Sequence, residues 1–253
     1  AVGSWQLVTT LKGHEGWMRS AFFSPNSKMI VTASEDRTVR LWDAATGDEL
    51  YQFVGHQDIA VFATFSPDGQ QIASAGFDGT VRLWDVSSHR PVRTFTSQSH
   101  FNNSLAFSPD GAILASGTGD ADGVNQVEFW QIDTGEVAHE PLLHSGPVRS
   151  VAFTPDGKSL LTAGHGNPVQ LWDLERNKPL RIFTEHEKSV WAANFSTDGQ
   201  FFITASEDRT ARIWVTTIET QIALANALLQ RDPPIFRPEE RSHLISQLIG
   251  DGN

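Results

Sequence analysis

A tryptophan near the end of a short apolar run recurs five times in this chain at nearly constant spacing. The runs read VRLWD, VRLWD, VEFWQ, VQLWD and ARIWV, and their tryptophans are Trp42, Trp84, Trp130, Trp172 and Trp214. Successive tryptophans are 42, 46, 42 and 42 residues apart. Self-similarity at a fixed period is typical of repeat architectures, so the chain is a five-fold repeat.

A second marker gives the same period independently. Each copy carries a short turn sequence, FSPNS, FSPDG, FSPDG, FTPDG or FSTDG, which places Pro25, Pro67, Pro109, Pro155 and Thr197 at steps of 42, 42, 46 and 42 residues. Both long steps must contain the same insertion. Four extra residues therefore lie between Pro109 and Trp130, within SGTGDADGVNQVE.

Each copy reads as four short β-strands. In the second copy DIAVFATFS alternates before the SPDG turn, QQIASAG and TVRLWDV flank an FDG turn, and PVRTFT runs on to the next copy. The β-branched and aromatic residues of these runs favour strands. Helical periodicity is absent through residue 215, so the pattern predicts an all-β fold over most of the chain.

Four strands per 42-residue copy, with Trp-Asp at the end of the third strand, is the WD40 pattern. Over residues 5–215 the chain resembles the WD40-repeat β-propellers. The resemblance implies a β-propeller of five four-stranded blades over residues 1–215, followed by a short C-terminal helical tail over residues 216–253. The repeats span about residues 11–52, 53–94, 95–140, 141–182 and 183–215, with residues 5–12 as the closing strand of the last blade.

The resemblance also implies a buried hydrogen-bonded set in each blade. Its members are a His before the first strand, a hydroxyl on the second strand, the Asp of the following turn and the Trp of the third strand. Three copies contain all four: His14, Thr32, Asp36 and Trp42; His56, Ser74, Asp78 and Trp84; His186, Thr204, Asp208 and Trp214.

The third and fourth copies lack members of the set. The fourth copy has Gly166 where the Asp belongs, although it keeps His144, Thr162 and Trp172. The third copy has Gln98 at the His position and keeps Ser116 and Trp130 in register. We therefore expect the third and fourth blades to be the less rigid ones.

A His beside a hydroxyl and a carboxylate also invites a catalytic reading. A buried imidazole and a buried indole N–H each need hydrogen-bond partners, however, and the hydroxyl and the carboxylate supply them. A catalytic arrangement is needed once, whereas this set recurs whole in three copies. No GxSxG, HExxH or P-loop string offers a nucleophile, metal or phosphate site. We therefore predict that the chain is not an enzyme and uses no cofactor.

The composition excludes some classes of partner. The net charge of -11, from 30 acidic against 19 basic residues, argues against nucleic acid, which requires a basic face. No window of 18 apolar residues predicts a membrane span. There is no Cys, so thiolate metal sites and disulfides are excluded. We expect a cytoplasmic protein.

The insertion in the third copy holds oxygen ligands at short spacing, as calcium loops require. These residues are Asp120, Asp122, Asn125 and Glu128. The segment does not match an EF-hand, because Gly123 comes one residue early and no flanking helices are predicted. We expect an acidic hairpin tip, with a calcium or magnesium site as the alternative.

After Trp214 the pattern becomes helical. TTIETQIALANALLQRD carries apolar residues at helical spacing before Pro233-Pro234, and RPEERSHLISQLIGDG predicts a second helix. This tail is similar to tails that end the WD-repeat regions of multidomain bacterial signalling proteins such as NACHT-type P-loop ATPases. The helices either bind a partner or another domain, or simply cover apolar surface.

Five repeats raise the question of ring closure, because WD40 rings usually have seven blades. SWQLVTTLKGH looks like an outer strand, and the fifth copy has none of its own, so Trp5 to Lys12 is expected to close the ring on Arg212 to Thr216. The alternative is a piece of a larger propeller whose open edges pair with strands elsewhere.

The resemblance implies a non-catalytic scaffold that binds protein or peptide partners through one face of the propeller. The alternative is a C-terminal sensor or regulatory fragment of a larger WD-repeat signalling protein, whose ring is completed by other blades or copies; its partners then include other domains of the same parent protein. A purely structural role in assembly is a further class, in which the face is covered in the full-length protein.

The same resemblance implies that the exposed positions of that face lie three and five residues after the His position and one residue before the turn Asp. In this chain they are Trp17, Arg19 and Glu35; Ile59, Val61 and Phe77; Phe101 and Asn103; Pro147, Arg149 and His165; Ser189, Trp191 and Glu207. Trp and Arg are enriched in binding hot spots. We expect Trp17, Phe77, Phe101 and Trp191 to form one apolar patch, unless some of these side chains turn inward.

Overall fold

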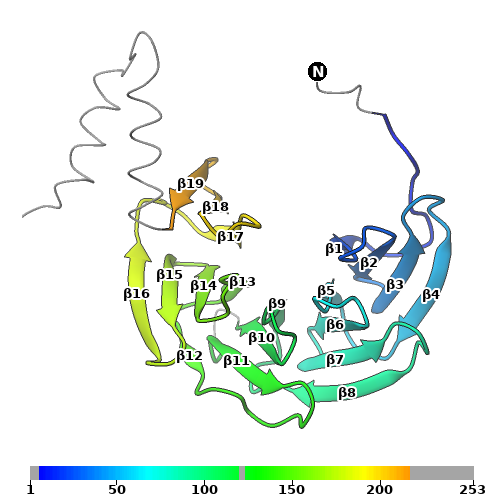
Figure 1. Ribbon diagram of the computed structural model, residues 1–253, viewed down its shortest axis with the longest axis horizontal. Helices are drawn as coiled ribbons and strands as arrows, with labels where there is room; N and C mark the ends of the chain where they lie inside the picture. The colour runs from blue at the N-terminus through cyan, green and yellow to red at the C-terminus, as the bar shows by residue number, and fades with distance from the viewer. Residues whose placement is uncertain (1–5, 120–122, 217–253) are drawn as a thin grey trace, which may run out of the picture. The chain divides into compact units, whose positions relative to one another are not determined.

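Every repeat folds into one antiparallel sheet, called a blade below. The computed structural model describes residues 6–119 and 123–216, in which all regular elements are β-strands (Figure 1). Strands follow one another in chain order across each blade. The predicted all-β WD40 architecture is confirmed, whereas the predicted helical tail falls on residues 217–253, outside the described residues.

The blades have these strands. Blade 1 contains β1 (Met18–Phe23), β2 (Met29–Ser34), β3 (Thr38–Asp43) and β4 (Glu49–Val54). Blade 2 contains β5 (Ala60–Phe65), β6 (Gln71–Gly76), β7 (Thr80–Asp85) and β8 (Pro91–Thr96). Blade 3 contains β9 (Asn102–Phe107), β10 (Ile113–Thr118), β11 (Gln126–Gln131) and β12 (Leu142–Leu143). Blade 4 contains β13 (Val148–Phe153), β14 (Ser159–Gly164), β15 (Asn167–Asp173) and β16 (Lys178–Phe183). Blade 5 contains β17 (Val190–Phe195), β18 (Phe201–Ser206) and β19 (Ala211–Val215).

The turn between the first two strands of each blade is set by its own side chains. In blade 2 the Ser66 hydroxyl donates to Asp68 Oδ1 at 2.6 Å, and Asp68 Oδ1 also accepts from the Gln70 N–H at 2.9 Å. Gly69 adopts a φ of 72°, a left-handed conformation that glycine reaches without a Cβ clash. The Ser-Pro-Asp-Gly sequence therefore reverses the chain at this point.

The apolar core lies between neighbouring blades. Val31, Leu41 and Phe53 of blade 1 pack in one cluster with Ile72 and Trp84 of blade 2. The Phe53 and Trp84 rings are 5.3 Å apart. The next interface repeats this packing, with Phe95 of blade 2 and Trp130 of blade 3 also 5.3 Å apart. Each repeat thus buries its apolar face on the next one, as expected for a repeat protein.

The first strands of successive blades lie side by side (Figure 1). β1 packs on β5, β5 on β9, β9 on β13, and β13 on β17. Serine hydroxyls join two of these pairs: Ser20 Oγ accepts from the Ala63 N–H at 3.0 Å, and Ser150 Oγ accepts from the Ala193 N–H at the same distance. Side chains at equivalent places in the repeats therefore hold the blades together.

The closing strand expected from the sequence is not formed among the described residues. Residues 6–12 have no strand conformation, and the last sheet has three strands in the order β17-β18-β19. Ring closure by residues 5–12 stays a prediction.

Candidate partner-binding face

One residue near the start of the first strand of every blade is left out of the strand pairing. The register skips from Met18 to Ser20 in β1, and the same irregularity occurs in β5, β9, β13 and β17. The residues skipped are Arg19, Val61, Asn103, Arg149 and Trp191, called the bulge residues below. A β-bulge turns a side chain out of the normal alternation, and bulges are frequent next to functional sites.

The bulge residues are the positions that the sequence placed five residues after the His. A backbone hydrogen bond ties the loop just before them to the turn between the second and third strands in all five blades. The bonds run from Glu35 N to Trp17 O, Phe77 N to Ile59 O, Gly119 N to Phe101 O, His165 N to Pro147 O and Glu207 N to Ser189 O, at 2.9 to 3.0 Å. The predicted face positions of each blade are therefore neighbours, and Gly119 is a member in blade 3 that the sequence analysis missed.

Two tryptophans on this face are solvent-exposed. Trp17 is 77% exposed and Trp191 is 51% exposed. The Trp191 indole N–H donates to Glu207 Oε1 at 3.1 Å, and the Arg149 guanidinium lies 5.5 Å from the centre of the Trp191 ring. An exposed indole held by a carboxylate and a cation offers a large rigid surface to a partner.

Arg149 is also fixed from blade 3. Its Nη1 donates to Asn103 Oδ1 at 2.7 Å, and Asn103 Nδ2 donates to the carbonyl of Gly119 at 2.9 Å. Asn103 is only 6% exposed, so it differs from the exposed position expected from sequence. The side-chain amide of Asn103 is buried because it lies between the Arg149 guanidinium and the Gly119 carbonyl and is hydrogen-bonded to both.

The remaining predicted face residues are less uniform. The rings of Phe77 and Phe101 meet edge-on at 4.8 Å and are half-buried, so they contact each other rather than stand free. Arg19 forms an ion pair with Glu35 at 2.7 Å. Ile59 and Val61 are half-buried, His165 and Glu207 are exposed, and Pro147 and Ser189 are buried.

The buried sets lie directly beneath this face. In blade 1 His14 Nδ1 is 2.7 Å from Asp36 Oδ2, His14 Nε2 is 2.7 Å from Thr32 Oγ1, and the Trp42 indole donates to the same hydroxyl at 2.8 Å. Blade 2 repeats the arrangement with His56, Asp78, Ser74 and Trp84 at 2.8 to 3.1 Å. In blade 5 His186 lies 2.7 Å from both Asp208 and Thr204.

The carboxylates of these sets are strongly acidic. Burial alone would raise the pKa of Asp36, but hydrogen bonds from Thr38 and His14 outweigh it and hold the pKa well below its usual range. Burial opposes hydrogen bonds from His56 in the same way at Asp78, where the pKa is also lowered. Both carboxylates therefore serve as ionised hydrogen-bond acceptors in the folded chain.

Blade 4 has no acceptor for its histidine. Both ring nitrogens of His144 are buried and make no hydrogen bond in the part of the chain that the structure describes. Burial lowers the pKa of His144 to about 4. Trp172 still donates to Thr162 Oγ1 at 3.0 Å. Gly166 lies in a shorter turn, in which Gly164 pairs with Asn167.

Blade 3 uses a different side chain in place of the histidine. The Ser116 hydroxyl donates to Asn102 Oδ1 at 3.0 Å, and Asn102 is fully buried. Asn102 was not among the residues predicted from the sequence, because it lies four residues after Gln98, where the His position falls. An amide at a position of the first strand that is otherwise apolar or small could have pointed to it.

The insertion in blade 3 is only partly described, since Asp120 and Asp122 lie outside the described residues. Glu128 belongs to β11 rather than to a hairpin tip. It is 8% exposed, and its Oε1 accepts from Gln126 Nε2 at 2.7 Å and from the Gln98 N–H at 3.0 Å. The metal site was the alternative to the expected hairpin tip, and the Glu128 carboxylate is engaged by Gln126 and Gln98 inside the blade. Among the described residues, no group of three or more His, Cys, Asp or Glu side chains is arranged so that it could hold a metal ion.

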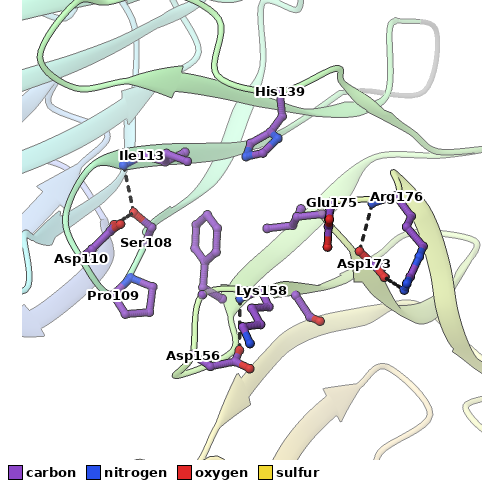
Figure 2. Close-up of a pocket in the computed structure, with 14 residues that line it drawn as sticks. Ser108, Pro109, Asp110, Ile113, His139, Asp156, Lys158, Asp173, Glu175 and Arg176 are labelled. Atoms are coloured by element: carbon purple, nitrogen blue, oxygen red, sulfur yellow. Dashed lines mark hydrogen bonds and ion pairs between the residues drawn. The ribbon is translucent and has the colours of Figure 1, made fainter.

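A hollow of about 770 Å³ lies at the other end of the first strands, between blades 3 and 4 (Figure 2). Its carboxylates are engaged in local turns: Asp110 accepts from Ser108, Asp156 from the Lys158 N–H at 3.1 Å, and Asp173 from Arg176 at 2.8 Å. These groups hold the turns in place, so the hollow is a weaker candidate than the bulge residues.

No helix with the length and apolar character to cross a membrane is found in the described part of the chain.

Comparisons with curated proteins give short matches. The chain is similar to the protein pleiotropic regulator PRL2 of Arabidopsis thaliana (46% identity over 43 residues, 17% of this chain and 9% of that protein). It is also similar to the pre-mRNA-splicing factor PRP46 of Yarrowia lipolytica (40% over 43 residues, 17% and 10%) and to the nuclear distribution protein nudF of Aspergillus niger (35% over 49 residues, 19% and 11%).

These matches span about one repeat and about a tenth of each relative's length. The family model described as "WD domain, G-beta repeat" extends much further. It matches five times, at residues 5–43, 47–85, 89–124, 138–173 and 177–215. With five matched repeats, five sheets whose strands follow in chain order and their recurring tryptophans, the chain belongs to the WD40 repeat family.

Proposed function

We propose that this chain is a non-catalytic scaffold that captures a protein or peptide partner on the face carrying the bulge residues. One observation carries the proposal: all five blades turn the equivalent residue out of strand pairing, and exposed Trp191 is one of these residues, while exposed Trp17 lies two residues before another, Arg19. WD40 relatives with the words regulator, splicing factor and nuclear distribution in their names support an interaction role over a catalytic one.

The test uses peptides selected from a random display library on the immobilised full chain. We expect Trp17→Ala and Trp191→Ala each to weaken binding of the selected peptides by about 2 kcal/mol or more, the usual effect of truncating a hot-spot tryptophan. Leu180→Ala is the matched control, because Leu180 is 55% exposed on the outer strand β16 and lies away from the face. Equal binding by the wild type and the Trp17, Trp191 double variant would move the site to the rim or the tail.

A second candidate function is that of a partial propeller completed by other WD repeats. β1 is exposed at five of its six positions, whereas its counterpart β5 has no exposed position. At the other end, Ile203 and Ile213 of blade 5 are exposed beside an apolar hollow of about 410 Å³. In a blade that has a neighbour on the same side, the corresponding strand face is buried against that neighbour. Additional blades or a second copy of the chain would therefore cover the exposed faces of blades 1 and 5.

A further inference from the structure

Arg149 is a half-buried cation without a carboxylate partner in the described part of the chain. Its guanidinium has five N–H donors, and within residues 6–119 and 123–216 one of them is used, to Asn103 Oδ1 at 2.7 Å. Its Nε is buried and makes no hydrogen bond with these residues. Burial, and then the positive charge of Arg19, lower the pKa of Arg149 from its ordinary value. The folded chain thus holds a positive charge in an unfavourable place.

The acids that the structure describes on the same face, Glu35 and Glu207, have other partners than Arg149. Glu35 is engaged by Arg19 at 2.7 Å, and Glu207 accepts from the indole of Trp191 at 3.1 Å. Asn103 contacts Arg149 as a neutral amide. Partly buried charges in proteins are normally paired, so a missing counter-ion at a surface site indicates that a ligand supplies it.

The surroundings of Arg149 define the shape of such a ligand. Asn103 fixes the guanidinium from one side, and the indole of Trp191 lies against it with a distance of 5.5 Å from ring centre to Cζ. A planar guanidinium with free donors matches a carboxylate, which it binds through two parallel hydrogen bonds. Beside it, Trp191 is half exposed and offers an apolar surface for a neighbouring side chain.

We propose that Arg149, positioned by Asn103 and Trp191, binds the side-chain carboxylate of an Asp or Glu in a peptide segment of the partner. This inference rests on the proposed function and names the chemistry recognised by that face. The net charge of -11 does not oppose it at physiological salt, because charges beyond about 8 Å are largely screened. Recognition is then local and depends on Arg149 rather than on overall attraction.

The experiment uses synthetic peptide arrays in which one central residue is fixed as Glu, Asp, Gln or Lys and its neighbours are random. We expect the labelled full chain to bind the Glu and Asp arrays roughly tenfold or more above the Gln array, because a charge-assisted hydrogen bond is much stronger than a neutral one. Arg149→Gln is expected to reduce this preference to about twofold or less. Arg176→Gln is the control, since Arg176 is exposed and lies at the other end of blade 4.

Asn103→Asp provides a second variant that keeps Arg149. It places a carboxylate 2.7 Å from the guanidinium, where the amide oxygen now lies, so an internal counter-ion competes with the peptide. We expect the same loss of the Glu and Asp preference, with the thermal midpoint of each variant checking that the blade remains folded. An unchanged preference in folded Arg149→Gln or in folded Asn103→Asp would overturn the assignment.

The remaining outcomes separate the two proposals. The wild type could bind the Glu and Gln arrays equally, or prefer the Lys array, while Trp17→Ala abolishes this binding. That result would contradict the carboxylate site but still support the proposed binding face. Binding to no array would contradict both proposals. The thermal midpoint of the wild type could rise with free acetate or phosphate at constant ionic strength while no peptide binds. In that case the ligand of Arg149 would be a small anion, and the proposal of a peptide carboxylate would be wrong.

Discussion

At the scale of single residues, the carboxylates beneath the face combine several tasks. Asp36 lies 2.7 Å from His14 and accepts from the N–H of Glu15 at 3.0 Å and of Thr38 at 2.9 Å. It therefore ties the loop before the first strand to the turn after the second. A carboxylate that holds a buried imidazole in one orientation contributes to stability through the groups it satisfies, with no catalytic step required.

Removing this carboxylate should destabilise the fold. We expect Asp36→Ala and Asp78→Ala each to lower the free energy of unfolding by about 1 to 3 kcal/mol, because a buried imidazole and backbone N–H groups lose their acceptor. Urea denaturation followed by tryptophan fluorescence measures the change. Asp48→Ala, at an exposed position, is the control and should stay within about 0.5 kcal/mol of the wild type. An unchanged urea midpoint for both buried variants would show that the sets do not stabilise the blades.

His144 should make stability depend on pH. Its pKa is about 4 in the folded chain against an ordinary value of 6.5, so between these pH values the unfolded chain binds the extra proton. The free energy of unfolding that depends on neutral His144 is fully present above about pH 6.5 and is lost as the pH falls to about 4. The shift sets an upper limit of about 3 kcal/mol on this loss.

The variant His144→Gln isolates that contribution. We expect its urea midpoint to fall less than that of the wild type between pH 7 and pH 4, because the glutamine binds no proton. His100→Gln, at an exposed position, should follow the wild type. Parallel pH profiles for all three proteins would contradict the buried, neutral state of His144.

At the scale of strands and blades, hydroxyl groups connect neighbouring first strands. Ser150 of β13 accepts from the Ala193 N–H at 3.0 Å and donates to the Ala193 carbonyl at 3.1 Å, so one side chain replaces a missing strand partner. Ser104 occupies the equivalent position in blade 3, where its hydroxyl is buried and has no hydrogen bond among the described residues. The same residue type at the same repeat position is thus satisfied in one blade and not in the other.

These two serines form a matched pair of variants. We expect Ser150→Ala to lower the free energy of unfolding by about 1 kcal/mol or more, because it leaves the Ala193 peptide group without its partner. Ser104→Ala should be neutral or slightly stabilising, since it removes a buried hydroxyl that has none. Chemical denaturation of both variants measures the difference. A Ser104→Ala change as costly as Ser150→Ala would contradict the assigned hydrogen bonds.

At the scale of the whole molecule, the two terminal blades differ from those between them. Phe23 at the end of β1 is 63% exposed, whereas Phe65 at the same place in β5 is 7% exposed. In a repeat protein each unit is stabilised by its neighbours, so a unit that lacks one exposes the surface that a neighbour would bury. Exposed apolar strand faces of this kind favour association.

We therefore expect the full chain to associate with increasing concentration, as measured by light scattering. Phe23→Glu should reduce association, because it places a charge on the exposed face of β1. Trp17→Ala, on the face of the bulge residues, should leave association unchanged and serves as the control. A monodisperse monomer at all concentrations would instead favour a ring closed within one chain.

The sequence by itself determined the architecture and most of the buried sets. A period of 42 residues and a recurring tryptophan predict the same packing in every unit, so the number of repeats and most of their strands could be read directly, whereas the joining of His14, Asp36 and Trp42 in one set was what the resemblance to WD40 repeats implied. These features depend on residues at fixed spacing within one repeat, which is the information that self-comparison contains.

Only the tertiary structure decided what depends on contacts between blades. The sequence placed Arg149 and Asn103 on one face, but it could not show that they bond across 46 residues or that Asn103 is buried. It also missed Asn102 in place of the histidine of blade 3 and placed Glu128 at a hairpin tip instead of inside a sheet. The physical reason is that these features depend on how neighbouring strands and blades pack. Packing decides where a bulge forms, which residue of the next blade becomes a partner and whether a charge has a counter-ion, and a repeat pattern does not contain that information.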